Sequence, residues 1–105
     1  MDFAASVLYA AAQVPRGKVT TYKMIAEALG KADSCRAVGS ALNKNPDPHL
    51  MPCYRVIRSD GRVGGYALGE SEKIRLLAVD GIAVEGGRVA GYRSILFRPA
   101  PVKVP

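Results

Sequence analysis

Apolar residues recur at helical spacing in four stretches of the chain, and each stretch is closed by residues that end helices. The first stretch begins after Asp2, which is favourable at a helix start, and stops at Pro15-Arg16-Gly17. The second is capped by Thr20 or Thr21 and ends at Gly30. The chain therefore starts with two helices joined by a short extended link.

A third helix is predicted to run as far as Asn43, with Asp33 or Ser34 as its cap. The following Asn45-Pro46-Asp47-Pro48 cannot continue a helix. With the second helix and the tight turn at Gly30, this segment has the outline of a helix-turn-helix. Any two packed helices give a similar outline, so this pattern by itself leaves both interpretations open.

The remaining pattern adds a small β component. Val56-Ile57 is typical of a short buried strand, and a fourth helix is predicted between Glu70 and Asp80-Gly81. Alternating residues on either side of Gly86-Gly87 predict a hairpin. The tail from about residue 92 to residue 105 is expected to be extended and to follow the surface. We predict a mainly α fold with a small β component, that is, a winged-helix-like domain with a helix-turn-helix.

Length and composition narrow the function classes. A chain of 105 residues fits a single domain over residues 1–105. No segment is typical of a membrane span, and the start lacks a basic signal region, so an intracellular setting is expected. Two cysteines and one histidine disfavour a disulfide framework or a closed metal site, and no cofactor is expected. The net charge of +6 suits a polyanionic partner.

The candidate chemistry lies at Cys53, which directly follows Pro52. Proline fixes its own φ and restricts the residue before it, so the backbone that presents the thiol is stiff. A thiol held in this way beside Tyr54 and Arg55 is a candidate nucleophile. An isolated cysteine is more often a small buried apolar residue, and that interpretation also stands. Cys35 is expected to be a packing residue.

The third helix has two faces of different composition. Its packed face is predicted to hold Ala37, Val38, Ala41 and Leu42, and its outer face Arg36, Gly39, Ser40 and Asn43 with Lys44 at the rim. A glycine inside a helix costs about 1 kcal/mol relative to alanine, so Gly39 at an exposed position calls for an explanation. This face is either simply exposed to solvent, or its side chains are small so that a DNA backbone can approach closely.

A glycine-rich loop follows the candidate strand. Asp60-Gly61 is a turn signal, and Gly64-Gly65 permits backbone angles that are closed to other residues. The loop is therefore expected to wrap around a ligand or a core element. Tyr66 is either one wall of a pocket or a plug in the core.

From Phe3 to about Gly91, the chain resembles the C-terminal domain of O6-alkylguanine-DNA alkyltransferases, which move an alkyl group from damaged guanine onto their own cysteine. The family's Pro-Cys-His-Arg-Val motif stands here as Pro52-Cys53-Tyr54-Arg55-Val56. Further matches in the same order are Val19-Thr20-Thr21-Tyr22, Arg36-Ala37-Val38-Gly39-Ser40-Ala41, Asn45-Pro46 and Gly64-Gly65-Tyr66. Several motifs in order are far more specific than any one of them.

The resemblance implies a role for each matching residue. Cys53 would accept the alkyl group, with Tyr54 and Asp80 at the positions of the family's histidine and glutamate. Tyr22 would press on the phosphate, rotate the nucleotide out of the duplex and protonate the departing guanine, while Arg36 would fill the gap. The residues facing the minor groove of double-stranded DNA would be Tyr22, Arg36, Ala37, Gly39, Ser40, Asn43 and Lys44. The pocket would be formed by Asn45, Pro52, Val56, Tyr66 and Ala67.

Two departures from the family keep a second function open. A phenol is a poorer proton acceptor than an imidazole at neutral pH, so Tyr54 would weaken or reorganise the proton relay. The short chain is also similar in size to alkyltransferase-like proteins, which bind alkylated DNA without repairing it. We therefore expect a monomer that either repairs O6-alkylguanine by direct transfer or recognises it and recruits downstream repair proteins. A small winged-helix regulator that uses no thiol chemistry is the remaining alternative.

Overall fold

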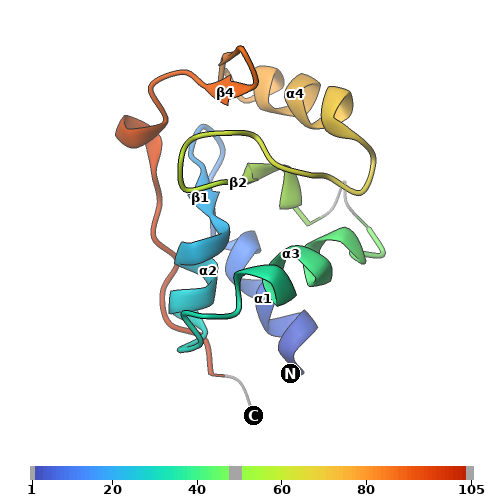
Figure 1. The fold of residues 1–105 in the computed structure, drawn as a ribbon, viewed down its shortest axis with the longest axis vertical. Coiled ribbons are helices and arrows are strands. Elements are labelled where there is room, and N and C mark those ends of the chain that lie inside the picture. Colours follow the sequence, from blue (N-terminus) through green and yellow to red (C-terminus); the bar gives the residue numbers. More distant parts are fainter. Residues whose placement is uncertain (1, 48–50, 104–105) are drawn as a thin grey trace.

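Three helices pack together at one end of the computed structural model, which describes residues 2–47 and 51–103 (Figure 1). They are α1 (Phe3–Ala12), α2 (Tyr22–Ala28) and α3 (Cys35–Asn43). The Asp2 carboxylate caps α1 by accepting a hydrogen bond from the Ala5 amide, and the Thr21 hydroxyl caps α2 by accepting one from Met24. Ser34 precedes α3 without a side-chain cap bond. Helices α2 and α3 form the predicted helix-turn-helix, with Gly30 left-handed at φ +69° in the turn.

A parallel pair of very short strands joins the helical end to the rest of the molecule. Strand β1 (Thr20–Thr21) lies beside β2 (Val56–Ile57), with Thr20 opposite Val56 and Thr21 opposite Ile57. A 3-10 turn, η1 (Cys53–Arg55), leads directly into β2. The buried strand at residues 56–57 was predicted, but its pairing with the link before α2 was not. Because the two strands are parallel, the pairing places Arg58, just after β2, beside Tyr22 at the start of α2.

The second end consists of α4 (Glu70–Val79) and a hairpin of β3 (Val84–Glu85) and β4 (Arg88–Val89). The predicted turn at Gly86-Gly87 connects the two strands. The backbone of the loop after β2 also bonds to the hairpin, with Val89 N donating to Gly61 O at 2.8 Å. A separate apolar cluster that includes Ile57, Val63 and Leu77 holds this end together.

The tail differs from its prediction. It begins with a second 3-10 helix, η2 (Tyr92–Ile95), and then runs down beside α2 (Figure 1). Phe97 N donates to Val19 O at 2.7 Å, and Val102 N donates to Ala28 O at 2.8 Å. The Val102 side chain is buried in the cluster formed by α1, α2 and α3. The tail therefore covers apolar surface of the helical end. Burying the apolar Val102 side chain is favourable because it removes apolar surface from water.

The predicted class, mainly α with a small β component and a helix-turn-helix, is confirmed by these elements and by the likeness to solved structures reported below. Within residues 2–47 and 51–103, no helix is long and apolar enough to cross a membrane.

Candidate functional site: a buried cysteine next to a helix-turn-helix

Cys53 is the first residue of η1, and its side chain is only 4% exposed. The Asn45 side-chain amide donates to Cys53 Sγ at 2.8 Å and to Met51 O at 3.4 Å. Asn45 Oδ1 also accepts from the Asp47 amide, which fixes the turn that follows α3. Burial raises the pKa of the Cys53 thiol, while the Asn45 hydrogen bond and the charge of Lys73 act in the opposite direction. One amide therefore holds both the turn and the sulfur.

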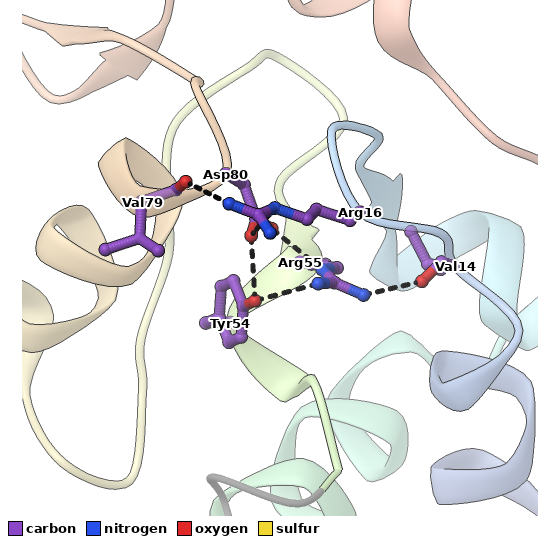
Figure 2. A network of polar contacts seen from close by, with 6 residues as sticks. All are labelled: Val14, Arg16, Tyr54, Arg55, Val79 and Asp80. Carbon is purple, nitrogen blue, oxygen red and sulfur yellow. Dashed lines mark hydrogen bonds and ion pairs between the residues drawn. The ribbon is translucent and has the colours of Figure 1, made fainter.

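Tyr54 and Asp80, which were predicted to act with Cys53, contact each other through a polar network (Figure 2). The Tyr54 hydroxyl donates to Asp80 Oδ1 at 3.2 Å and accepts from Arg55 Nη2 at 2.9 Å. Arg55 Nε donates to Asp80 Oδ2 at 2.9 Å, so the buried carboxylate has a charged partner. Burial raises the pKa of Tyr54; Arg55 opposes this and Asp80 adds to it. At neutral pH Tyr54 is therefore a hydrogen-bond donor to Asp80.

Arg55 joins three elements through the same network. Its Nη1 donates to Val14 O at 2.9 Å, just beyond α1, while its Nε reaches Asp80 at the end of α4 (Figure 2). Arg16 lies on the outer side and donates to Val79 O at 3.0 Å. Removing one partner of a buried ion pair typically costs about 3 to 5 kcal/mol. Arg55 is therefore a structural member of the motif, a role that the sequence pattern did not identify.

Lys73 is a second residue that the sequence reasoning missed. Its side chain is fully buried, and Nζ donates to Val56 O at 2.6 Å and to Gly65 O at 3.0 Å. The ammonium lies 5.8 Å from the centre of the Tyr22 ring. Burial lowers the pKa of Lys73 to about 7, and the nearby Cys53 opposes this shift. The available signal was the position of Lys73 four residues before Leu77, on the inner face of α4.

Tyr22, the first residue of α2, lies at the edge of a hollow of about 370 Å³. Its hydroxyl donates weakly to Gly65 O at 3.4 Å, and burial raises the pKa of Tyr22, with Arg58 acting in the opposite direction. Gly64 is left-handed at φ +73°, and a Cβ on it would lie 2.7 Å from the Tyr22 hydroxyl. We call this space the Tyr22 hollow; it is lined by Tyr22, Cys35, Arg36, Gly39, Asn43, Arg58, Gly64 and Gly65.

The predicted DNA-facing residues of α3 divide between two hollows. Arg36, Gly39 and Asn43 line the Tyr22 hollow, whereas Ala37, Ser40 and Lys44 line another hollow beside the start of α1. Ala37 was also predicted on the packed face, and that prediction is wrong because Ala37 is exposed. The buried residues of α3 are Val38, Ala41 and Leu42, and half-buried Cys35 packs against the same core. The buried stripe of α3 is thus narrower than the pattern indicated, and most of the helix surface is open to a partner.

The predicted pocket residues are buried to different degrees. Asn45 and Val56 are buried, Pro52 and Tyr66 are half-buried, and Ala67 is exposed. Tyr66 packs against both apolar clusters of the protein. Cys53 itself does not line the Tyr22 hollow. Among the described residues, no group of three or more histidine, cysteine, aspartate or glutamate side chains lies close enough to hold a metal ion.

These features define a small helix-turn-helix domain with an intact cysteine buried next to the helix pair. The chain matches the family described as 6-O-methylguanine DNA methyltransferase, DNA binding domain, over residues 2–82. The protein belongs to this family.

Relatives of known sequence and structure agree with this assignment. The chain is 52% identical over 77 residues to a bifunctional methyltransferase/endonuclease of Picrophilus torridus, covering 73% of this chain and 26% of that protein. It is 42% identical over 85 residues to the methylated-DNA–protein-cysteine methyltransferase of Methanothermobacter thermautotrophicus, covering 81% of this chain and 47% of that protein. The chain thus spans from about a quarter to about half of the length of these relatives.

The fold is similar to that of S. pombe Atl1, solved in complex with damaged DNA containing O6-carboxymethylguanine. The TM-score is 0.80 at 28% identity, and the match covers 92% of this chain and 95% of that chain.

Proposed function

We propose that this protein repairs DNA by moving an alkyl group from O6 of guanine in duplex DNA to Sγ of Cys53. The observation that supports this most directly is the intact cysteine itself, held by Asn45 at the base of the helix-turn-helix. The positive charge of Lys73 favours the thiolate, which is the nucleophilic form of cysteine. The relatives named as methylated-DNA–protein-cysteine methyltransferases support the same chemistry.

The transfer is a single displacement that needs no cofactor. Cys53 gives its proton to water, and the thiolate attacks the alkyl carbon; the S–C bond forms as the C–O6 bond breaks. The electron pair of the broken bond stays on the guanine, which takes a proton from the Tyr22 hydroxyl, and the tyrosinate regains a proton from water. The raised pKa of Tyr22 keeps that hydroxyl protonated at neutral pH. Because the thioether is stable, each protein molecule acts once.

The buried position of Cys53 requires the guanine to leave the duplex. Flipping a nucleotide costs a few kcal/mol, and the Arg36 side chain inserted into the gap offsets part of that cost. Helix α3 approaches the minor groove closely at Gly39, because a larger residue at this position would place its side chain between the helix and the DNA. Other groove and backbone contacts come from the exposed members of the predicted set, Ala37, Ser40, Asn43 and Lys44. The flipped base enters between Tyr22 and a pocket of Asn45, Pro52, Val56, Tyr66 and Ala67.

Mass spectrometry after incubation with a duplex containing one O6-methylguanine tests this proposal. The expected result is a gain of one CH2 on the peptide that contains Cys53 and none on the peptide that contains Cys35. Cys53→Ser should abolish the gain, and Cys35→Ser should retain it. Transfer to any other residue, or transfer by Cys53→Ser, would contradict the proposal.

A sensor that binds O6-alkylguanine and recruits other repair proteins is the second candidate function. It is favoured by the near-complete coverage of S. pombe Atl1 and by the Tyr54 hydroxyl, which is engaged by Asp80 and Arg55. In that case the damaged duplex would be bound more tightly than an undamaged one and recovered with its methyl group intact. In either case we propose that the protein acts as a monomer inside the cell.

A further inference from the structure

We propose that the duplex also contacts a second basic surface, which extends from Arg58, beside α3, to Arg88 and Arg93 and binds the phosphate backbone. This inference rests on the proposed function only in taking duplex DNA as the partner. It does not require Cys53 to react.

The nine arginines of the chain fall into two groups according to their partners. Five form ion pairs with carboxylates: Arg16 and Arg55 with Asp80, Arg62 with Asp60, Arg75 with Glu72 and Arg98 with Glu27. Within the described ranges, the other four have no carboxylate at ion-pair distance: Arg36, Arg58, Arg88 and Arg93. All four of these side chains are exposed. Exposed guanidinium groups without a carboxylate partner are available to an external anion.

The four unpaired arginines lie along connected hollows of the surface. Arg36 and Arg58 line the Tyr22 hollow, and Arg58 also lines a neighbouring hollow of about 320 Å³ that reaches Asp60. Asp60 in turn borders a hollow of about 530 Å³ that is lined by Arg88 and Arg93. The hairpin that carries Arg88 lies at the opposite end of the molecule from α1, α2 and α3 (Figure 1). The connected hollows therefore lead from α3 to the hairpin.

Electrostatics along this path favours a polyanion. Arg62 and Arg88 are paired across a backbone bridge, and like charges placed opposite each other destabilise a β pair. Asp60 is close enough for Arg62, Arg58 and Arg88 to lower its pKa, after the larger effect of its hydrogen bond from the Arg62 amide. Glu85 faces Arg88 in the hairpin register. Residues 58–62 and 88–93 nevertheless contain four arginines against one aspartate, a net +3, which is half of the chain's net charge.

The position of these arginines points to phosphates and not to bases. Arg58 directly follows β2, Arg88 lies in a two-residue strand, and Arg93 lies in η2, where its guanidinium stacks on Tyr92 at 5.6 Å from the ring centre. None of them is on a helix that can enter a groove. Contacts to phosphates fix a protein on the duplex without reading sequence. The surface should therefore strengthen binding to damaged and undamaged duplexes by the same factor.

The experiment measures how affinity depends on salt for wild type, Arg88→Ala/Arg93→Ala, and the control Arg75→Ala/Arg98→Ala. The control removes the same charge, but its arginines are held by Glu72 and Glu27. Each lost phosphate contact should reduce the slope of log K against log salt by about 0.9, so the surface variant should lose about 1.8 and the control close to none. Arg88→Lys/Arg93→Lys keeps the charge and should retain the slope, which separates lost contacts from misfolding.

Equal slopes for the surface variant and the control would overturn the inference, because net charge would then explain the binding. A loss confined to the damaged duplex would overturn it too, since a backbone contact cannot recognise the lesion. Wild-type protein that binds with this slope but transfers no alkyl group would contradict the proposed function and leave the inference standing.

Discussion

At the scale of single residues, Cys53 and Lys73 set the chemistry of the pocket. Both are buried, and each influences the ionisation of the other: the Lys73 charge lowers the pKa of Cys53, and Cys53 raises that of Lys73. The residue at the position of the family's histidine, Tyr54, instead donates its proton toward Asp80. The structure therefore makes Lys73 the cation most relevant to the thiolate.

Replacing Lys73 with methionine should move the reactivity of Cys53 to higher pH. The substitution removes the positive charge that opposes the burial of the thiolate, so the pKa of Cys53 should rise further. The measurement is the rate of alkylation by iodoacetamide against pH in a Cys35→Ser background. An unchanged profile would show that Lys73 does not influence the thiol.

Replacing Tyr54 with phenylalanine should affect stability more than thiol chemistry. The change removes hydrogen bonds to Asp80 and from Arg55, each worth about 0.5 to 1.5 kcal/mol. Urea unfolding should therefore show a loss of about 1 to 3 kcal/mol, while the iodoacetamide profile of Cys53 stays in place. A clear shift of that profile would instead indicate that Tyr54 takes part in the proton relay.

The variant Tyr54→His tests whether an imidazole at this position raises the transfer rate.

The motif residues and their neighbours differed in how far the sequence identified them. Cys53 and Asn45 could be found because Pro-Cys and Asn-Pro are local signals, and the structure places them in contact. Lys73 was missed although its spacing from Leu77 places it on the inner face of α4, because a lysine in a helix is normally assigned to the solvent side. Its burial depends on two carbonyl acceptors, at Val56 and Gly65, that lie far away in the sequence.

At the scale of elements, local rules predicted the helices well. Thr21 caps α2, Asn43 is the last residue of α3, and Gly86-Gly87 turns the hairpin, all as expected. The pairing of Thr20–Thr21 with Val56–Ile57 was not predictable, because two-residue strands leave no alternation and their partner is distant in the chain. The position of Val102 in the core was missed for the same reason: only the folded helices create the surface that it covers.

Gly64→Ala should disturb the position of Tyr22. The new Cβ would lie 2.7 Å from the Tyr22 hydroxyl, and φ +73° adds strain. Gly87→Ala is a matched control, since its φ of +79° brings similar strain but no atom lies within 4 Å of the added Cβ. Single-turnover transfer from a damaged duplex should slow in Gly64→Ala and not in Gly87→Ala. Equal rates in both variants would rule out the contact as the cause.

At the scale of the whole molecule, Lys73 makes stability depend on pH. Its pKa falls from an ordinary value of 10.5 to about 7 on folding, so the unfolded chain binds more protons above neutrality. The free energy of unfolding should then rise with pH between about 7 and about 8.5. At higher pH the raised pKa of Cys53 acts in the opposite direction. Urea titrations across this range should show the rise in wild type and a flatter dependence in Lys73→Met; an equal slope in both would refute the assignment.

The distribution of arginines is the other property that belongs to the whole molecule. Net charge was evident from the sequence and favoured a polyanionic partner, but composition does not reveal which guanidinium groups already have carboxylate partners. Folding pairs Arg55 and Arg98 with Asp80 and Glu27, which are distant in the chain, and leaves Arg58 and Arg88 available. The basic surface can therefore be identified only when the structure shows which arginines are already paired.

The most direct test of the central claim is a count of methyl groups transferred per protein molecule. A limiting amount of protein is incubated with excess duplex carrying isotopically labelled O6-methylguanine, and the label on protein and DNA is followed to completion. The account predicts that each protein molecule takes up a single methyl group, on Cys53, after which the reaction stops. DNA that keeps all of its label, or a protein that releases label through many cycles, would contradict it.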